Sequence, residues 1–448
     1  MAFLFLPIFI FHIFLGLFTM ISIEDLYAIY KQFPSIQTDT RKLEKNDLFF
    51  ALKGENFNGN LFANQAIEKG AAFAIVDENV DGNLSERIIL VEDVLKTLQA
   101  LAKYHRQQFS IPFLAITGSN GKTTTKELIH AVLSSSLRTY TTEGNLNNHI
   151  GIPLTILKVK FDAEIAVIEM GANHLKEIEG YCQYTLPTHG IITNVGKAHL
   201  EGFGSLEGVK KGKGELYDFL RNNNGTAFVM WDYDYLRGLS KGIPHIISYG
   251  TRDATVVGSI CQTEPYLSVD ISGSISIKNI STKLTGDYNL PNVLAAVTVG
   301  NYFNIDTKKV KTAIENYLPS NSRSQLLELN SNKIILDAYN ANPTSMRAAI
   351  ENIGKFNVKN KVLILGGMAE LGETSLQEHE NILALIKKYS WKDVALVGGD
   401  FLKIDHPYNR FTNSTEAGQW FQRQNYSDAY ILIKGSRSMK MEKVLSKE

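Results

Sequence analysis

Short, fully apolar runs alternate with segments of helical periodicity through the middle of the chain, residues 106–317. Residues 113–116 and 165–168 are such runs, and residues 127–133 have the spacing of an amphipathic helix. Strands that are apolar at every position are buried on both faces, which is typical of parallel sheets covered by helices. The pattern therefore predicts a mostly parallel α/β sheet. Three further strands are expected at residues 190–195, 227–230 and 245–248.

Residues 253–285 break this pattern, because short alternations of Val, Ile, Ser and Thr replace the helical segments. Alternation with a period of two is typical of half-buried strands, so we expect a few antiparallel strands there. A helix is expected to follow over residues 288–299.

The chain before the middle section predicts a small α/β unit over residues 20–105. Ser22 is expected to cap its first helix, with Asp25 at the third helical position. The other elements are expected to be a strand over residues 47–55 closing in a Lys-Gly turn, helices over 63–69 and 94–107, and a strand over 72–76.

After Pro319 the strand and helix alternation restarts, which predicts a Rossmann-like, doubly wound domain over residues 318–448. No G-x-G-x-x-G pattern opens its first strand, so we do not expect a dinucleotide there. Its strands are expected at residues 334–336, 362–365, 394–397 and 430–433, and its helices at 345–353, 377–387, 415–422 and from Ser438 onward.

Composition supports a globular protein of about three domains, given its 448 residues. Lys+Arg and Asp+Glu both number 46, so net charge offers no argument for a nucleic-acid partner or an anionic membrane. The two cysteines, Cys182 and Cys261, form neither a C-x-x-C pair nor a disulfide framework, which fits a reducing cytoplasm. We expect a cytoplasmic monomer.

Residues 1–19 form a hydrophobic segment without a charged residue. Such a segment is long enough to span a bilayer, but it has neither the basic start nor the small-residue cleavage site of a signal peptide. It fits a membrane anchor, an uncleaved signal or codons upstream of the true start. We favour the last, since Met20 opens a normal amphipathic helix.

The segment from Thr117 to Thr123, Thr-Gly-Ser-Asn-Gly-Lys-Thr, lies between a predicted strand and a predicted helix. Glycines allow backbone N–H groups to converge on anionic oxygens, and the helix adds its positive end. Lys122 and Thr123 then suit phosphate and Mg²⁺. The first glycine of the usual pattern is replaced by Ile116, and an ordinary Gly-Lys-Thr turn is the alternative.

Three charged side chains follow predicted strands or helix starts of the same section. Glu169 ends a fully apolar strand, where a carboxylate requires a cation or a hydrogen-bonding partner. His199 and Lys213 belong to Asn194-Val-Gly-Lys-Ala-His-Leu-Glu201 and Lys210-Lys-Gly-Lys-Gly-Glu215. Taken singly, each also fits an ordinary role: a strand-end acid, a surface or core histidine and a solvated helix start.

Two polar regions remain. The run 142–155 is rich in Asn and Gly, which suits phosphate or peptide recognition but also an Asx-rich turn. In the last domain, residues 337–343 and 434–437 each follow a strand and therefore open at the same sheet edge. Lys434 and Arg437 around Gly-Ser suit a carboxylate clamp, unless they are simply two exposed cations at a turn.

Taken together these motifs resemble the Mur ligase family, ATP-dependent amide-forming enzymes of peptidoglycan precursor synthesis, from about Met20 to the C-terminus. The shortened phosphate loop is normal in that family. The motifs that carry the resemblance are Thr38-Asp-Thr-Arg41, Leu48-Phe-Phe-Ala-Leu-Lys-Gly-Glu55, Thr117-Gly-Ser-Asn-Gly-Lys-Thr-Thr124, Gly144-Asn-Leu-Asn-Asn148, Glu169-Met-Gly-Ala172, Ala198-His-Leu-Glu-Gly-Phe203, Asp337-Ala-Tyr-Asn-Ala-Asn-Pro343, Leu365-Gly-Gly-Met-Ala-Glu-Leu-Gly372 and Lys434-Gly-Ser-Arg-Ser438.

The last two motifs favour the branch that adds D-alanyl-D-alanine to UDP-N-acetylmuramoyl-tripeptide through an acyl phosphate. The Asp-Asn-Pro-Arg signature of the branch that adds diaminopimelate or lysine is absent from the sequence. Another Mur-type ligase, folylpolyglutamate synthase and a membrane-anchored nucleotide-binding scaffold are the alternatives.

The resemblance also implies roles for single residues. UDP-sugar binding falls to residues 20–105 with Thr40, Arg41, Lys53 and Gly54. ATP binding in residues 106–317 falls to Gly118, Ser119, Asn120, Gly121, Lys122, Thr123 and Thr124, with Asn289 and Asn292 at the adenine and Arg323 and Asp337 reaching across from residues 318–448. Two Mg²⁺ ions are implied at Thr123, Glu169, His199 and a carbamylated Lys213, and the catalytic residues are Lys122, Glu169, His199 and Lys213.

The peptide substrates are implied to contact Asn145, Asn147, Asn148, Tyr339, Asn340, Asn342, Lys434, Ser436 and Arg437, with D-Ala-D-Ala in the last domain. Two departures limit the transfer of roles. Asn58-Gly-Asn60 stands where the family often has Asp-Gly-His, so no UDP contact is assigned to Asn60. Asp287-Tyr288 replaces the usual lead-in to Asn289.

Overall fold

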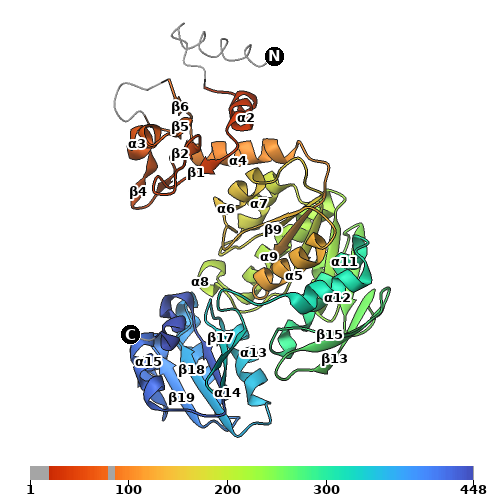
Figure 1. Cartoon of the computed structure of the whole chain (residues 1–448), viewed down its shortest axis with the longest axis vertical. Coiled ribbons are helices and arrows are strands. Elements are labelled where there is room, and N and C mark those ends of the chain that lie inside the picture. The colour runs from red at the N-terminus through yellow and green to blue at the C-terminus, as the bar shows by residue number, and fades with distance from the viewer. Residues whose placement is uncertain (1–19, 79–85, 447–448) are drawn as a thin grey trace. The chain divides into compact units, whose positions relative to one another are not determined.

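The structure is a computed structural model that describes residues 20–78 and 86–446 (Figure 1). It divides into two compact units. The first comprises the chain up to Ile111 together with Thr142–Asp162 and Gln183–Leu186, and the second comprises the remainder. The expected segment 1–19 lies outside the described residues. None of the described helices is long and apolar enough to cross a membrane.

The first unit holds a small parallel sheet in the order β1-β2-β5-β6. Its helix α2 begins as expected, because the Ser22 side chain accepts a hydrogen bond from the N–H of Asp25 at 3.1 Å. Helix α4 packs against α2 and α6. The elements are α2 (Ile23–Gln32), β1 (Ile36–Gln37), β2 (Leu48–Phe50), β3 (Lys53–Gly54), β4 (Phe57–Asn58), η1 (Gly59–Phe62), α3 (Ala63–Glu68), β5 (Phe73–Val76), β6 (Ile88–Leu90), α4 (Val94–Arg106) and α6 (Gly151–Leu157).

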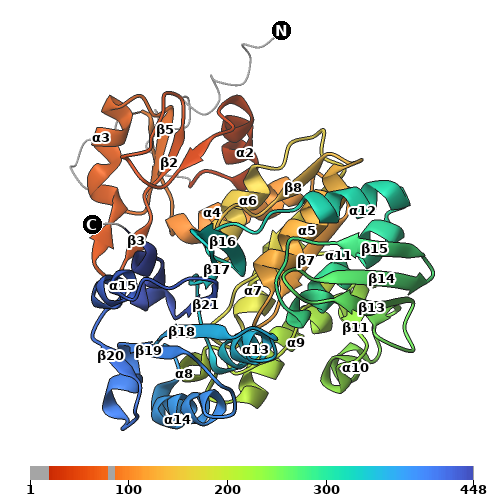
Figure 2. The same ribbon diagram turned by 60° about the horizontal axis from the view of Figure 1, so that its bottom comes forward.

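The second unit opens with a nine-stranded sheet in the order β15-β14-β13-β12-β11-β10-β7-β9-β8. Its strands are β7 (Phe113–Thr117), β8 (Thr139–Thr141), β9 (Ile165–Glu169), β10 (His189–Ile192), β11 (Thr226–Met230), β12 (His245–Gly250), β13 (Val256–Gln262), β14 (Ser268–Gly273) and β15 (Ile277–Ser281). In this order, each strand from β13 through to β8 is parallel to its neighbour. The antiparallel pairs β13–β14 and β14–β15 extend one edge, as Figure 2 shows.

Both the parallel section and the antiparallel extension were expected, and the α/β fold class is confirmed. Helix α5 packs on β7 and β9, and α11 packs against α5 (Figure 1). The helices of this part are α5 (Lys122–Ser134), α7 (Glu177–Thr185), α8 (Leu200–Phe203), α9 (Leu206–Asn222), α10 (Asp234–Ser240), η2 (Asp287–Asn289), α11 (Leu290–Tyr302) and α12 (Thr307–Asn316).

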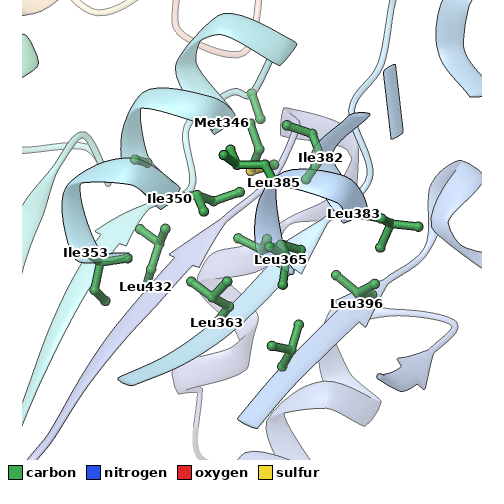
Figure 3. Packing of buried hydrophobic residues seen from close by; sticks show 14 of the residues in the cluster. Met346, Ile350, Ile353, Leu363, Leu365, Ile382, Leu383, Leu385, Leu396 and Leu432 are labelled. Carbon is green, nitrogen blue, oxygen red and sulfur yellow. The ribbon is translucent and has the colours of Figure 1, made fainter. Parts of the chain in front are cut away.

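The C-terminal part of the second unit has a six-stranded sheet in the order β16-β17-β21-β18-β19-β20, in which only β16 is antiparallel to its neighbour. Figure 3 shows Met346, Ile350 and Ile353 of α13 packed with residues of α14 and of the sheet. The elements are β16 (Gln325–Leu329), β17 (Asn332–Asp337), α13 (Pro343–Gly354), β18 (Asn360–Gly366), η3 (Gly372–Thr374), α14 (Ser375–Ile386), β19 (Asp393–Val397), η4 (Gly399–Lys403), β20 (Asn409–Phe411), α15 (Ser414–Arg423), β21 (Ala429–Lys434), η5 (Arg437–Met439) and η6 (Met441–Leu445).

Three local predictions are wrong. The final helix from Ser438 is two short 3-10 helices, η5 and η6, because Lys440 between them adopts a left-handed backbone with φ 49°. Lys53–Gly54 is not a turn but strand β3, which pairs with β4. The strand expected to reach Val195 ends at Ile192, and the residues after it turn toward the loop that follows β7.

Candidate nucleotide and acyl-transfer site

The loop between β7 and α5 depends on two glycines with a positive φ, Gly118 at 141° and Gly121 at 79°. A Cβ on Gly118 would lie 2.0 Å from Thr193 Oγ1, and one on Gly121 would lie 2.7 Å from Asn292 Oδ1. Both values are far inside van der Waals contact. The loop therefore excludes side chains at two positions, which lets the backbone approach an anion closely at the start of α5, as phosphate binding requires.

Residues after β10 hold this loop in place. The N–H of Asn120 donates to Asn194 Oδ1 at 3.0 Å, and Asn194 Nδ2 donates back to the Asn120 carbonyl at 3.0 Å. The same carbonyl accepts from Thr193 Oγ1 at 2.6 Å, while the N–H of Ser119 donates to the Asn194 carbonyl at 3.0 Å. Ser119 Oγ is engaged with Gly196. Thr193 and Asn194 were not predicted, although Asn194 opens the run that contains His199.

Lys122 and Thr123 open α5, with Thr124 beside them in the first turn. Lys122 Nζ donates to the Gly118 carbonyl at 2.7 Å and therefore lies over the loop. Thr123 Oγ1 donates to Glu169 Oε1 at 3.2 Å, and both side chains are buried. Burial lowers the pKa of Lys122, while the Glu169 carboxylate opposes this shift and Arg323 adds to it. The structure thus brings Lys122, Thr123 and Glu169 together as expected.

Lys213 is not at a solvated helix start. It lies in the interior of α9, which Ser205 caps, and it is 1% exposed. Its Nζ donates to the Ala172 carbonyl at 2.9 Å and lies 5.0 Å from the centre of the Phe203 ring. Burial, with a contribution from the charge of Lys122, holds its pKa well below the usual value. A lysine in this environment favours the neutral, nucleophilic amine.

His199 caps α8 with a left-handed backbone, φ 54°. Its Nδ1 lies 2.6 Å from Glu370 Oε2, and the imidazole lowers the pKa of the Glu370 carboxyl. Glu370 was not assigned a role, although it lies in the run 365–372 that carries the family resemblance. In this structure the His199 imidazole therefore contacts a carboxylate, that of Glu370, from the C-terminal part of the second unit.

Asn289 and Asn292 lie behind the phosphate loop, and their side chains are hydrogen bonded within the protein. Asn289 Nδ2 donates to the Thr285 carbonyl, and Asn292 Nδ2 donates to Asn289 Oδ1, both at 2.8 Å. Asn292 Oδ1 accepts from Thr125 Oγ1 at 3.0 Å. Since both asparagines are buried, these contacts support α5 and the loop; the expected adenine contact stays a prediction.

In the C-terminal part, two guanidinium groups lie close to the Tyr339 ring. The Arg323 guanidinium carbon lies 3.5 Å from the ring centre and that of Arg437 lies 5.7 Å from it. Arg323 also acts electrostatically on Lys122, so its charge reaches the nucleotide site. The predicted Arg323, Tyr339 and Arg437 are thus brought together.

Four other predicted residues of this part are engaged with their neighbours. Lys434 Nζ pairs with Asp337 Oδ2 at 2.5 Å. Asn340 Oδ1 accepts from the N–H groups of Ala341 and Arg437. Ser436 Oγ is buried and donates to the Gly367 carbonyl at 2.7 Å. The prediction that residues 337–343 and 434–437 open at one sheet edge is correct.

Asn342 connects α13 to the phosphate loop. Its Oδ1 accepts from the N–H of Ser345 at 2.9 Å and caps α13, while its Nδ2 donates to Asn120 Oδ1 at 2.8 Å. The Asn342 carboxamide therefore caps α13 and also holds the nucleotide loop.

The remaining predicted residues belong to the first unit. Arg41 forms an exposed ion pair with Asp39. Lys53 pairs with Asp77 and Glu78, each at 3.1 Å. Gly54 pairs with Phe57, and the Thr40 carbonyl accepts from Lys69.

The asparagine run of this unit is partly a local turn. Asn148 Oδ1 accepts from the N–H groups of Ile150 and Gly151 at the start of α6, and the carbonyl of Asn145 accepts from the N–H of Asn147 at 2.8 Å. The Asx-turn interpretation therefore holds for Asn148.

Three family models match the chain in succession: "Mur ligase family, catalytic domain" at residues 32–106, "Mur ligase middle domain" at 116–300 and "Mur ligase, glutamate ligase domain" at 322–437. A curated Bacillus subtilis (strain 168) protein, UDP-N-acetylmuramoyl-tripeptide–D-alanyl-D-alanine ligase, is 36% identical over 92% of each chain.

Two solved structures are similar over nearly the whole chain. A MurF crystal structure from Acinetobacter baumannii has a TM-score of 0.84 and 30% identity, covering 92% of each chain. The MurF ligase from Thermotoga maritima in complex with ADP has a TM-score of 0.83 and 26% identity, covering 92% of this chain and 96% of that one.

Proposed function

The chain belongs to the Mur ligase family, and we propose that it joins D-alanyl-D-alanine to UDP-N-acetylmuramoyl-tripeptide at the expense of ATP, giving a peptidoglycan precursor. The observation that carries this function is the loop from Gly118 to Thr123, backed by buried Glu169 and buried Lys213. The similar Bacillus subtilis protein carries the name of this ligase, and the Thermotoga maritima MurF ligase was solved in complex with ADP.

The reaction has two steps. The terminal carboxylate of the tripeptide attacks the γ-phosphorus of ATP, which forms an acyl phosphate and releases ADP. The amine of D-Ala-D-Ala then attacks the acyl carbon, phosphate leaves and the amine loses a proton. Negative charge accumulates on phosphoryl oxygens in the first step, so the enzyme's contribution is mainly electrostatic.

Lys122 and the loop supply positive groups for that charge. Lys122 Nζ donates a hydrogen bond to the Gly118 carbonyl of the loop and is within reach of a phosphate bound at the start of α5. Arg323, held on the Tyr339 ring, contributes a second cation from the C-terminal part. An acyl phosphate must be protected from water, which is consistent with closure of the domains around it.

A divalent cation fits the donor set. The Thr123 hydroxyl and the Glu169 carboxylate touch each other, and hydroxyl and carboxylate oxygens are the ligands Mg²⁺ prefers. Among residues 20–78 and 86–446, no three His, Cys, Asp or Glu side chains gather to hold a metal ion. Mg²⁺ would therefore be held by Thr123 and Glu169 together with substrate phosphates, and when bound it would neutralise phosphoryl charge.

Carbamylation of Lys213 would add a further anionic ligand. The neutral amine that burial favours is the form that adds CO₂, and the product carries a carboxylate-like group beside the loop after β9. His199 remains a proposed ligand for a second Mg²⁺.

Further assignments follow from the family. UDP-sugar binding is assigned to residues 20–105 with Thr40, Arg41, Lys53 and Gly54, ATP binding to 106–317, and D-Ala-D-Ala binding to 318–448. Lys434 is engaged with Asp337, so Arg437, which is exposed, is the better candidate for the dipeptide carboxylate. A cytoplasmic, monomeric enzyme is proposed.

An ADP-release assay with purified UDP-tripeptide tests the function. Release should depend on D-Ala-D-Ala and should be absent in Lys122→Ala. Glutamate as the better acceptor would favour folylpolyglutamate synthase, and lysine or diaminopimelate as the better acceptor would favour another Mur branch. If the wild type shows no ADP release that depends on any of these acceptors, the proposed ligase function is refuted.

A further inference from the structure

The loop that carries His199 is held from the C-terminal part of the second unit on several sides. The N–H of Lys197 donates to Thr344 Oγ1 at 3.1 Å, and Lys197 Nζ pairs with Glu378 Oε1 at 2.6 Å. The N–H of Glu201 donates to the carbonyl of Glu370 at 3.2 Å. Residues on both sides of His199 are therefore fixed by groups that follow β17 and β18.

His199 and Glu370 form the centre of this contact, with Nδ1 and Oε2 2.6 Å apart. Both residues have a left-handed backbone, φ 54° and 61°. Residues other than glycine rarely adopt this conformation unless the surrounding structure determines it, and such residues cluster at functional sites. The backbone on each side of the contact is thus arranged so that the two side chains meet.

The contact is a poor source of stability. The His199 side chain is 21% exposed and that of Glu370 is 48% exposed, and exposed ion pairs contribute little to the free energy of unfolding. Its effect on the imidazole is more specific. The contact does not have hydrogen-bond geometry in this structure, but a carboxylate 2.6 Å from Nδ1 favours the tautomer that carries its proton there, which leaves the lone pair on Nε2.

We propose that Glu370 is a positioning residue for His199: its carboxylate, 2.6 Å from Nδ1, keeps the proton on that nitrogen, so that Nε2 is the nitrogen available to a divalent cation. The inference rests on the proposed function, because that function supplies the cation. Glu370 lies in the part assigned to D-Ala-D-Ala, and His199 lies in the part assigned to ATP. The orientation of the imidazole therefore depends on the contact between these two parts of the chain.

The tautomer of His199 can be observed directly. In protein labelled with ¹⁵N-histidine, the His199 ring signals are assigned from their loss in His199→Gln. The wild type should show a protonated Nδ1 and a bare Nε2, and Glu370→Ala should lose this preference. A wild-type His199 protonated at Nε2 would overturn the inference without any activity measurement.

The second readout is metal affinity. Mn²⁺ binding to the nucleotide complex should weaken roughly 10–100-fold in Glu370→Ala, as is typical when the carboxylate behind a histidine ligand is removed. Glu370→Gln, which keeps an acceptor oxygen, should lie between Ala and the wild type, and it serves if the truncation does not fold. Glu373→Ala, an exposed acid on η3, is the matched control.

Unchanged His199 signals and unchanged Mn²⁺ affinity in both Glu370 variants would overturn the inference. A weaker affinity for D-Ala-D-Ala alone would also contradict it, because it would place Glu370 in the dipeptide site. Failure of the proposed function is separate: it would appear as an absence of acceptor-dependent ADP release in the wild type, while the tautomer is read in the same protein.

Discussion

Asp337 and buried Lys434 form an ion pair at the ends of two adjacent parallel strands, β17 and β21, with Oδ2 and Nζ 2.5 Å apart. Lys434 is 2% exposed at its side chain and Asp337 is 16% exposed. Asp337 Oδ1 also accepts from the N–H of Ser324. The family resemblance assigns these residues to different ligands, ATP and the peptide, whereas the structure joins them to each other.

Removing one partner should therefore destabilise the C-terminal part. Asp337→Ala leaves a buried ammonium without its carboxylate, which costs about 3–5 kcal/mol in comparable sites. Lys434→Met in the same chain removes the buried charge and should restore much of that stability. Urea unfolding of the single and double variants measures both effects.

Asp405→Ala is the control for that experiment, because its ion pair with Arg410 lies in the same part but is exposed. Its loss should change the free energy of unfolding by about 0–1 kcal/mol. An Asp337→Ala variant as stable as this control would show that the ion pair does not hold β17 and β21 together.

The phosphate loop and the helix starts could be predicted because their determinants are local. The glycines at 118 and 121, the apolar strand before them and the cap at Ser22 act over a few residues. The order of apolar strands likewise indicated a parallel sheet, since each is buried on both faces.

The contacts that complete the site could not be predicted in this way. Asn342 with Asn120 and Glu370 with His199 join residues that are distant in the sequence. Lys213 shows a second limit: its neighbours in sequence are charged and suggest solvent, but α9 turns Lys211 outward and Lys213 into the interior. Burial of a single lysine depends on packing against Phe203, which a local pattern does not show.

Gly118→Ala should weaken ATP binding more than tenfold. The new Cβ would lie 2.0 Å from Thr193 Oγ1 at a φ of 141°, so the loop must move. Tenfold corresponds to about 1.4 kcal/mol, which such strain readily exceeds. Gly238→Ala on α10 meets nothing within 4 Å and is the control. Calorimetry with an ATP analogue measures both, and equal affinities would rule out the close approach.

Asn342→Ser should raise the KM for ATP up to about tenfold, because Ser keeps the cap of α13 but is too short to reach Asn120 Oδ1. The hydrogen bond lost is worth about 0.5–1.5 kcal/mol. Ser345→Ala breaks the reciprocal cap bond and leaves the Asn120 contact in place. Steady-state kinetics should show the higher KM for ATP in Asn342→Ser and not in Ser345→Ala. An equal rise of KM in both variants would assign the effect to the cap of α13 and not to the Asn120 contact.

Lys213→Ala should lower kcat roughly 10²-fold or more if its carbamate stabilises transferred charge. In ¹³C-bicarbonate, the wild type should show a carbamate signal by ¹³C NMR, and acidification should remove it because only the neutral amine carries CO₂. Lys211→Ala alters an exposed lysine of the same helix and should retain the signal. A wild type without a carbamate signal would remove Lys213 from the proposed metal ligands.

His189 should make the central sheet sensitive to acid. Burial lowers the pKa of this β10 side chain to about 4, below the value of about 6.5 in an unfolded chain. Between these values the unfolded state binds the proton and the folded state does not. The neutral His189 therefore costs no stability above pH of about 6.5, and the free energy of unfolding falls as pH drops toward 4, by at most about 3.4 kcal/mol.

His189→Phe should keep the aromatic contacts with Phe228 and Phe303 and lose this part of the pH dependence. Denaturant unfolding at pH 7 and pH 4.5 gives the change for each protein, and the fall should be smaller in the variant. His245→Gln, at the exposed start of β12, should follow the wild type. A fall of equal size in His189→Phe would show that the acid sensitivity arises from other groups.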